Sequence, residues 1–421
     1  MTNDFLDKMK AETLESDSSR RLHARILEIS EIGRTENQGS KRMGYSEDEL
    51  AAKNKVAGWM EEIGMRVRTD GAGNVFGRYE GKDDSRVFMA GSHIDSVPDG
   101  GHFDGAAGVI TALEIATLWH EAGYRPKYSY EVVIFSDEEG SRFGSGLTGS
   151  RAFMGMLTEE EINKYRDPDG QTIDDVLSAI GSDREQFMKA EGPDHPIEIY
   201  AEVHIEQAKQ LEQKDLPVGI VSGIAGATRT NVTFRGEAGH AGSTPMTERK
   251  DALVKASEFI STLPEVAKGI SQEAVATVGK MDVKPGGVNV IPGEVNLVVD
   301  ARDIDEDNQA RLIEAVARHA EDTIKDSPVS VEVDLTTRVL PIPVDPEVIS
   351  KMEESFKRQD LLPVHLPSGA GHDAMSIGTE FPITMLFVKS IRGISHNPEE
   401  FTHIEDLNKS VQVLKDFFEN Y

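Results

Sequence analysis

The sequence predicts an α/β protein, with a main domain built on a mostly parallel central sheet flanked by helices and a smaller inserted α+β sandwich domain. The chain has 421 residues, too many for one ordinary hydrophobic core. Apolar strand-like runs alternate with helical patterns, which is typical of a parallel sheet. After Pro217 the composition changes, and two helical and several strand-like segments follow. We therefore place the main domain at residues 1–217 and 337–421 and the inserted domain at residues 218–336.

Periodicity and turn residues predict the elements of the main domain. In chain order these are helices over Ser19–Ile32 and Ser46–Ile63, a hairpin of Met65–Arg68 and Asn74–Tyr79, a strand at Val87–Ala90, a helix from near Val109, a buried strand at Glu131–Ser136, polar helical residues over Thr158–Glu191, a strand at Ile197–Ile205, a strand at Phe381–Val388 and a last helix from Glu405. The strand at Ile197–Ile205 alternates apolar residues strictly, which places Glu202 and His204 together on its other face.

The inserted domain carries its own strands and helices. The pattern predicts a strand from Thr228, a helix over Arg249–Thr262, strands at Ala274–Val283 and Val295–Asp303, a helix over Glu306–Lys325 and a strand at Val329–Thr337. The insertion begins and ends in flexible stretches, Pro217–Gly226 and Thr337–Pro341, so we expect it to swing relative to the main domain.

Composition excludes several classes of function. The net charge of −29 opposes binding to nucleic acid or to an anionic membrane, because phosphate contacts need a basic face. The N-terminal residues lack an apolar signal core, and no run of 18 apolar residues exists, so we expect a cytoplasmic enzyme. There is no Cys, so any metal site must use His, Asp and Glu.

The segment Gly91–Gly108, GSHIDSVPDGGHFDGAAG, is the most informative stretch of the chain. It places His93, Asp95 and Asp104 in a glycine-rich loop after a strand, where α/β proteins place ligands at the carboxyl edge of the sheet. Asp95 is within reach of the second ring nitrogen of His93 and would make that ring a better ligand. The alternative is a glycine-rich turn with solvated carboxylates.

Six ligand-type residues share this kind of position. His93, Asp104, Glu138, Glu139, His204 and His396 all lie at strand ends or in Gly- and Pro-rich loops. Two divalent ions held without thiolates need about five or six His and carboxylate ligands, one of which bridges. Of the adjacent glutamates, one can bind metal while the other stays free to move protons.

Eight motifs now resemble a known family. They are GSHIDSVPDGGHFDG (91–105), FSDEEGSRFGSGLTGSRAF (135–153), HIEQ (204–207), GHAGSTPM (239–246), GGVNVIPG (286–293), DARD (300–303), SGAGHDA (368–374) and SHNPEE (395–400). From about Ser19 to the C-terminus the chain resembles the dinuclear metallo-amidohydrolases related to aminoacylase and carboxypeptidase G. It is most similar to the branch of N-carbamoyl-L-amino acid hydrolases, allantoate amidohydrolases and β-ureidopropionases.

The resemblance implies a role for each matching residue. His93 and His204 would bind one ion, Glu139 and His396 the other, and Asp104 both; Asp95 would support His93, Glu138 would be the general acid/base, and Gln207, His240, Asn289 and Arg302 would bind substrate. In this family the inserted domain is a lid that also forms a homodimer, in which His240 and Asn289 can reach the neighbouring subunit's site. The ions can be Zn²⁺, Mn²⁺, Co²⁺ or Ni²⁺.

Two of these assignments have alternatives in which the residue plays no part in function. Arg302 projects from the non-core face of its strand, where it suits a bidentate clamp on a substrate carboxylate or a surface salt bridge with Asp300 or Asp303. His240 is a candidate donor to the developing oxyanion or an ordinary turn histidine. We place Gly369, Gly371 and His372 in the pocket lining, and His102 at a supporting or surface position.

The function that follows is hydrolysis of the ureido group of an N-carbamoyl-L-amino acid to the amino acid, ammonia and carbon dioxide. The closest alternative is the same chemistry on allantoate, followed by 3-ureidopropionate. Cleavage of peptide bonds, as a dipeptidase or aminopeptidase, is a second class. A metal-dependent binding protein without catalysis is a third, and the presence of Glu138 opposes it.

Overall fold

The computed structural model describes residues 5–190, 192–193 and 195–421, and the chain divides into two compact units. Unit 1 holds the chain up to Val221 together with Val344–Leu366 and His372–Tyr421. Unit 2 holds Ser222–Pro343 and Pro367–Gly371. Unit 2 is thus almost one continuous insertion into the sequence of unit 1.

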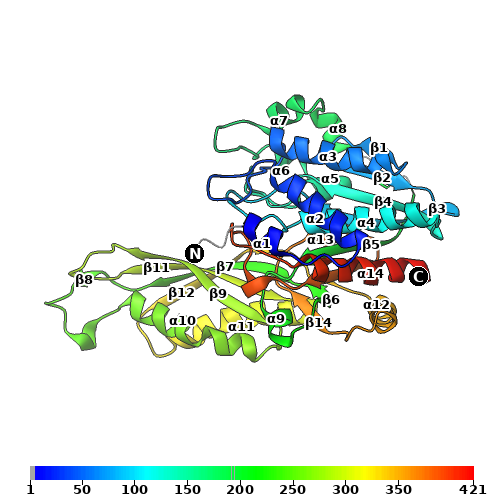
Figure 1. Cartoon of the computed structure of the whole chain (residues 1–421). Coiled ribbons are helices and arrows are strands. Elements are labelled where there is room, and N and C mark those ends of the chain that lie inside the picture. The colour runs from blue at the N-terminus through cyan, green and yellow to red at the C-terminus, as the bar shows by residue number, and fades with distance from the viewer. Residues whose placement is uncertain (1–4, 191, 194) are drawn as a thin grey trace. The chain divides into compact units, whose positions relative to one another are not determined.

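Unit 1 is built on a sheet that is parallel at its centre and antiparallel at its edges (Figure 1). The strand order is β1-β2-β4-β3-β5-β15-β6, in which β4, β3, β5 and β15 run parallel to one another. The strands are β1 (Arg66–Thr69), β2 (Val75–Tyr79), β3 (Asp83–His93), β4 (Tyr128–Phe135), β5 (Ile197–Ile205), β6 (Val218–Ile224) and β15 (Ile383–Val388), and β14 (His365–Ser368) also pairs with β6. The predicted α/β class with a mostly parallel central sheet is confirmed.

Helices cover both faces of this sheet. Tyr130 of β4 donates a hydrogen bond to the Ala112 carbonyl of α4 (3.0 Å), and its ring centroid lies 5.4 Å from that of Phe418 in α14. Phe135, an odd number of residues further along β4, lies 6.0 Å from Phe153 of α5. Since successive side chains of a strand point to opposite faces, α4 and α14 cover one face and α5 covers the other.

The helices of unit 1 range from short turns to long, buried elements. They are α1 (Phe5–Ala11), α2 (Asp17–Ser30), α3 (Glu47–Glu62), α4 (Ala106–Ala122), α5 (Thr148–Phe153), α6 (Glu159–Ile162), α7 (Ile173–Ala179), α8 (Arg184–Met188), α9 (Gln210–Lys214), α12 (Pro346–Arg358), α13 (Asp373–Ile377), α14 (Ile404–Asn420) and the 3₁₀ turn η2 (Ile391–Gly393). None of the described helices has the length and hydrophobicity needed to cross a bilayer.

Some predicted boundaries differ from the observed ones for local reasons. The helix predicted from Ser19 begins at Asp17, because the Ser16 hydroxyl caps it by accepting from Ser19 N (3.0 Å). In the predicted helical stretch Thr158–Glu191, whose last residue lies outside the described ones, three short helices form, and each starts at its own side-chain cap. The strand predicted at Val87–Ala90 starts earlier, at Asp83, since Asp83 also pairs with Tyr128 of β4, ahead of an irregularity before Val87.

Unit 2 is an antiparallel sheet with two helices on one face. The order is β12-β7-β11-β9, and β11 alternates buried and half-buried residues along its whole length. Its buried residues, such as Leu297, pack with Phe259 of α10 and Leu312 of α11. The elements are β7 (Gly226–Arg235), β8 (Gly239–His240), η1 (Met246–Glu248), α10 (Ala252–Lys268), β9 (Val275–Lys284), β10 (Val290–Ile291), β11 (Glu294–Asp303), α11 (Glu306–Ile324), β12 (Ser330–Arg338) and β13 (Ile342–Pro343).

Candidate metal centre

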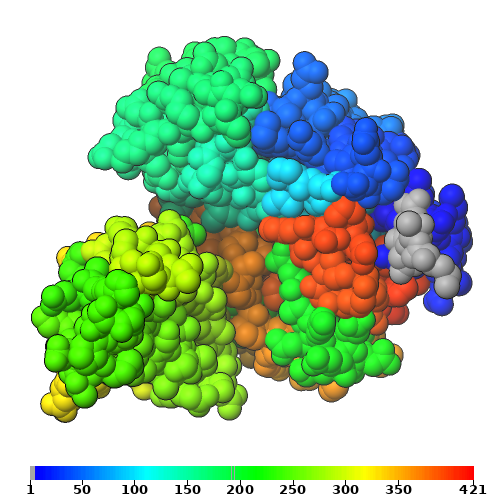
Figure 2. Space-filling model, turned by 90° about the vertical axis from the view of Figure 1, so that its left-hand side faces the viewer, coloured from blue at the N-terminus to red at the C-terminus, as the bar shows by residue number. Residues whose placement is uncertain are grey.

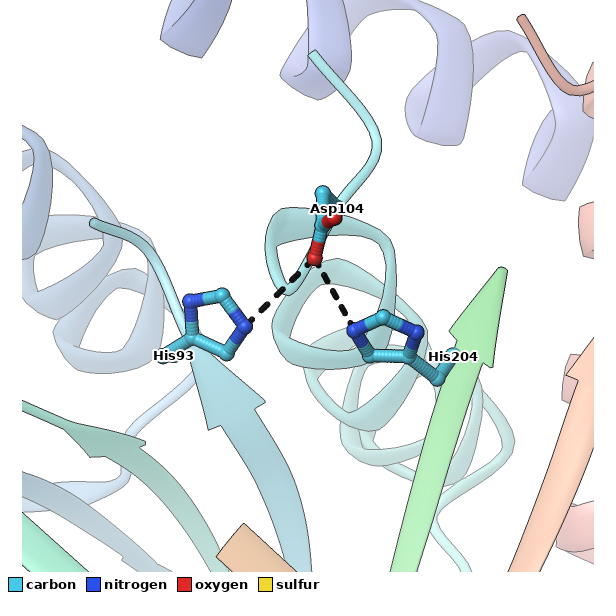
Figure 3. Close-up of side chains that lie close together, drawn as sticks. All are labelled: His93, Asp104 and His204. Carbon is cyan, nitrogen blue, oxygen red and sulfur yellow. Dashed lines mark ion pairs between the residues drawn. The ribbon is translucent and has the colours of Figure 1, made fainter. Parts of the chain in front are cut away.

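Three ligand-type side chains of unit 1 meet beyond the ends of β3 and β5 (Figure 3). His93 ends β3, His204 lies near the end of β5, and Asp104 precedes α4. Asp104 Oδ1 lies 3.0 Å from His204 Nε2 and 3.6 Å from His93 Nε2. All three side chains are buried. They form a group whose spacing could hold one cation, which we name group 1.

A second group shares Asp104 with the first. The other carboxylate oxygen of Asp104, Oδ2, lies 3.4 Å from His396 Nε2, which is also 3.4 Å from Glu139 Oε2. We name Asp104, Glu139 and His396 group 2; its ligand atoms lie within 4.8 Å of one another. His396 is half exposed, so group 2 is the more open of the two. Asp104 therefore offers one oxygen to each group.

Gly105 explains how Asp104 and His93 come so close. It precedes the first turn of α4 with a φ of +62°, a conformation that favours glycine. A Cβ at this position would also overlap the imidazole ring of His93. Glycine at position 105 is thus favoured by the left-handed backbone and required by the close approach of the His93 ring.

Asp95 organises the loop that carries the two glutamates. Its carboxylate oxygens accept hydrogen bonds from the backbone N–H of Glu138 and of Glu139, each at 3.1 Å. Oδ1 also lies 3.4 Å from His93 Nδ1. Asp95 is fully buried, so these contacts are not shared with solvent. It therefore fixes both glutamates and leaves His93 Nε2 directed at Asp104.

The side chains of the adjacent glutamates diverge. Glu138 Oε2 lies 3.5 Å from His93 Nε2, on the side of group 1, whereas Glu139 faces His396 in group 2. Three non-glycine residues around this centre, Asp137, Gln207 and His396, have left-handed φ values of 50°, 56° and 53°. Such conformations cost about 1–3 kcal/mol each and concentrate at functional sites.

The electrostatics of the centre are dominated by buried carboxylates. Burial raises the pKa of Glu138 well above its usual range, and it raises the pKa of Glu139 to about 7, with the Asp104 charge adding to it. Burial alone would raise the pKa of Asp104 too, but the neighbouring His204 and His396 outweigh it and hold that pKa well below normal. Burial would lower the pKa of His93, yet the Glu138 and Asp95 carboxylates raise it well above normal.

This donor set fits divalent cations. Among the described residues, the buried Oε1 atom of Glu139 has no hydrogen-bond partner. Four carboxylates, those of Asp95, Asp104, Glu138 and Glu139, lie with the buried imidazoles of His93 and His204 and the half-exposed imidazole of His396. Imidazole and carboxylate ligands without thiolate suit several first-row divalent ions. A cation in each group would neutralise the excess negative charge and engage the unpaired oxygen.

Two other predicted residues of unit 1 lie at the centre. Gln207 Nε2 donates a hydrogen bond to Asp104 Oδ2 at 3.0 Å, so Gln207 directly contacts the candidate metal ligand that both groups share. His372 is buried, and its ring centroid lies 4.4 Å from that of His204. Burial lowers the pKa of His372 well below its usual value, which keeps the ring neutral. Both remain predicted substrate-binding residues.

The remaining predicted residues belong to unit 2. His240 and Asn289 are exposed neighbours on the two-stranded ribbon of β8 and β10, where Ala241 N donates to Asn289 O at 3.0 Å. Arg302 forms the salt bridge with Asp300 that the sequence left open as an alternative: its Nε and Nη2 donate to the two carboxylate oxygens at 2.7 and 3.1 Å. Its Nη1 donates to Gly369 O at 2.7 Å. Gly371 is exposed. Their roles toward a substrate stay predictions.

Sequence reasoning missed Ser395 and Glu400. The Ser395 hydroxyl lies 2.8 Å from Asp104 Oδ2, and Glu400 accepts from the backbone N–H of Phe103 and Asp104. Both lie in the motif SHNPEE, whose only predicted site residue was His396; a polar residue that becomes buried in a loop leaves no periodic signal. His102 belongs to neither ligand group: it is buried against Phe5, and its Nε2 lies 2.9 Å from Gln38 O.

A family model, curated relatives and a solved structure all resemble this chain over most of its length. Residues 89–420 match the model of Peptidase family M20/M25/M40. An N-carbamoyl-L-amino acid amidohydrolase of Geobacillus stearothermophilus is 38% identical over 94% of this chain and 96% of its own length. An allantoate amidohydrolase of Escherichia coli is 33% identical over 92% and 94%. The crystal structure of an amidase of the hydantoinase/carbamoylase family from Burkholderia multivorans superimposes with a TM-score of 0.88 at 33% identity, covering 97% of this chain and 98% of that one.

Proposed function

The chain belongs to Peptidase family M20/M25/M40 and is a hydrolase of carbon–nitrogen bonds, and we propose that it hydrolyses the ureido group of N-carbamoyl-L-amino acids. One observation carries this proposal: Asp104 offers one oxygen to each of two ligand groups, while Glu138 lies beside them and belongs to neither. That is the arrangement required for hydrolysis assisted by two ions and a separate base. The names of several relatives supply the substrate class.

The proposed cofactors are two divalent ions, held by His93, Asp104 and His204 in group 1 and by Asp104, Glu139 and His396 in group 2. Bound there, such ions polarise the ureido carbonyl and lower the pKa of a water molecule. The ligand set accepts Zn²⁺, Mn²⁺, Co²⁺ or Ni²⁺. The overall products are the amino acid, ammonia and carbon dioxide.

Glu138 moves the proton in this proposal. Its carboxylate takes a proton from the attacking water and returns it to the leaving nitrogen. Burial raises its pKa, so it holds a proton more readily than an exposed glutamate does. Asp95 keeps the Glu138 backbone in place throughout, because the hydrogen bond to Glu138 N does not involve the reacting carboxylate.

Recognition of the substrate falls to Gln207 and His372 in unit 1 and to His240, Asn289, Arg302 and Gly371 in unit 2. Arg302 would hold the substrate carboxylate, and His240 would stabilise the developing oxyanion. We further propose that unit 2 acts as a lid and joins two chains into a homodimer. Its strand β12 is an edge strand with an exposed Leu335, which supports a contact with a second chain. A cytoplasmic location stays a prediction.

Allantoate is the second candidate substrate, since two relatives named allantoate amidohydrolase are each 33% identical to this chain. Ammonia release should be measured from N-carbamoyl-L-amino acids, allantoate, 3-ureidopropionate and dipeptides after loading with each of the four ions. The proposal expects the highest kcat/KM on an N-carbamoyl-L-amino acid. A preference for allantoate would move the assignment to the second candidate, and cleavage of dipeptides alone would overturn both.

A further inference from the structure

Glu400 connects two loops that carry different metal-ligand candidates. Its carboxylate is buried, and Oε1 accepts hydrogen bonds from Phe103 N at 2.9 Å and from Asp104 N at 3.1 Å. Its Oε2 lies 3.2 Å from the Ser395 hydroxyl, which precedes His396. In Figure 2 the orange-red C-terminal segment of unit 1 lies beside its cyan segment, which contains the loop of Asp104. Glu400 is the carboxylate that bridges these segments.

Ser395 extends this connection to the shared ligand. Its hydroxyl lies 2.8 Å from Asp104 Oδ2 and 3.2 Å from Glu400 Oε2. A hydroxyl has one proton, so it can donate to only one of these carboxylates at a time. The atom that it contacts, Oδ2, is the oxygen that Asp104 offers to group 2.

The ligands that are not shared between the groups depend on this connection to different degrees. Asp104, whose N–H donates to Glu400, belongs to both groups. His93 and His204, the other two ligands of group 1, extend from β3 and β5, whose ladders hold them whether or not Glu400 is present. His396 lies in the loop between η2 and α14, is half exposed, and has a left-handed backbone. The base of that loop is closed separately by the bond from Ile391 N to Phe401 O (2.9 Å). Loss of Glu400 should therefore displace His396 relative to Asp104 without opening the fold.

Gly101 shows how tightly Glu400 is seated. A Cβ at residue 101 would overlap the Glu400 carboxylate. The backbone of Gly101 is not left-handed, so alanine is compatible with its conformation. Gly101→Ala should thus push the Glu400 side chain out of place while leaving Glu400 itself in the sequence.

We propose that Glu400 is a positioning residue that holds the loop of His396 against Asp104 and thereby determines the affinity of group 2 for its cation. The proposal rests on the two-ion centre of the proposed function. The expected effect is larger on group 2, because His93 and His204 of group 1 lie at strand ends, whereas His396 of group 2 lies in the loop that Glu400 holds.

The test is a titration of the metal-depleted full-length protein with Zn²⁺, followed by calorimetry and elemental analysis. Wild type should bind two equivalents. Glu400→Ala should keep the first equivalent and bind the second ~10–100-fold more weakly, the usual effect of losing a group that orients a ligand. Gly101→Ala should reproduce this result. Glu400→Gln should recover most of the second affinity, because its amide oxygen can still accept from Phe103 N and Asp104 N.

The matched control is Glu399→Ala. The neighbouring Glu399 carboxylate is exposed and pairs with Arg392, so its removal should leave both equivalents unchanged. The proposal is overturned if Glu400→Ala binds the second ion as tightly as wild type, if both equivalents weaken alike, or if Glu400→Gln is as weak as Glu400→Ala. Fewer than two equivalents in wild type would instead overturn the two-ion centre itself, and the role of Glu400 with it.

Discussion

Asp104 Oδ1 lies 3.0 Å from His204 Nε2 at the end of β5, and the other oxygen of this carboxylate belongs to group 2. Because one carboxylate serves both groups, Asp104→Ala should lose both ions, which elemental analysis of the purified protein would measure. Asp99→Ala, in the same loop but bonded to Thr35 and Asn37, should keep both. Full metal occupancy in Asp104→Ala would remove Asp104 from the bridging position.

The meeting of these ligands could be predicted from sequence because strand order has a simple consequence. His93 and His204 lie at the ends of β3 and β5, Glu138 follows β4, and parallel strands end at one edge of the sheet. The alternation of β11 likewise predicted that Arg302 would leave the core face. The first inference needs only the rule that parallel strands end at the same edge of a sheet, and the second needs only the alternation of side chains along a strand.

Other contacts could not be predicted because they depend on loop conformation. Asp95 accepts hydrogen bonds from the backbone N–H of Glu138 and Glu139, which joins loops that are distant in sequence. Glu400 does the same by accepting from Phe103 N and Asp104 N. No periodic pattern marks such partners. Gln207 was predicted to bind substrate, and only the folded chain places its amide against Asp104.

Arg302→Ala should mainly raise KM for substrates that carry a carboxylate. The proposed clamp is a hydrogen bond to a charged group, worth ~1.5–3 kcal/mol. Steady-state kinetics on an N-carbamoyl-L-amino acid would measure the change. Arg235→Ala is the control, since Arg235 lies on the neighbouring strand β7 and pairs with Glu294 and Glu332. If KM stays at the wild-type value, Arg302 does not clamp the substrate.

The proposed dimer predicts complementation between two inactive chains. If His240 acts on the site of the other chain, co-refolded Glu138→Gln and His240→Ala chains should regain activity, because one site of each mixed dimer then has both residues intact. Each variant refolded alone should stay inactive. Absence of recovery in mixed dimers, separated by distinct affinity tags, would show that His240 acts within its own chain.

His403 should stabilise the fold in a pH-dependent way. Its Nδ1 lies 2.7 Å from a carboxylate oxygen of Glu12, and this contact raises the pKa of His403 above its ordinary value of 6.5. The charged form is favoured in the folded state, so the stabilisation is complete below pH 6.5 and disappears as pH rises through the higher folded pKa. Denaturant unfolding of His403→Gln should show a deficit at pH 6 that vanishes at high pH. An equal deficit at every pH would exclude the ion pair as its cause.

The most direct test of the account measures metal content and ammonia release on the same preparations of wild type and Glu138→Gln. The central claim is that a two-ion centre hydrolyses a ureido bond while Glu138 moves the proton. Wild type should hold two ions and release ammonia from an N-carbamoyl-L-amino acid; Glu138→Gln should hold both ions but turn over at least ~100-fold more slowly. Glu139→Gln should instead lose metal from group 2. A Glu138→Gln enzyme with wild-type turnover, or a wild type that holds two ions and releases no ammonia from any ureido acid, would contradict the claim.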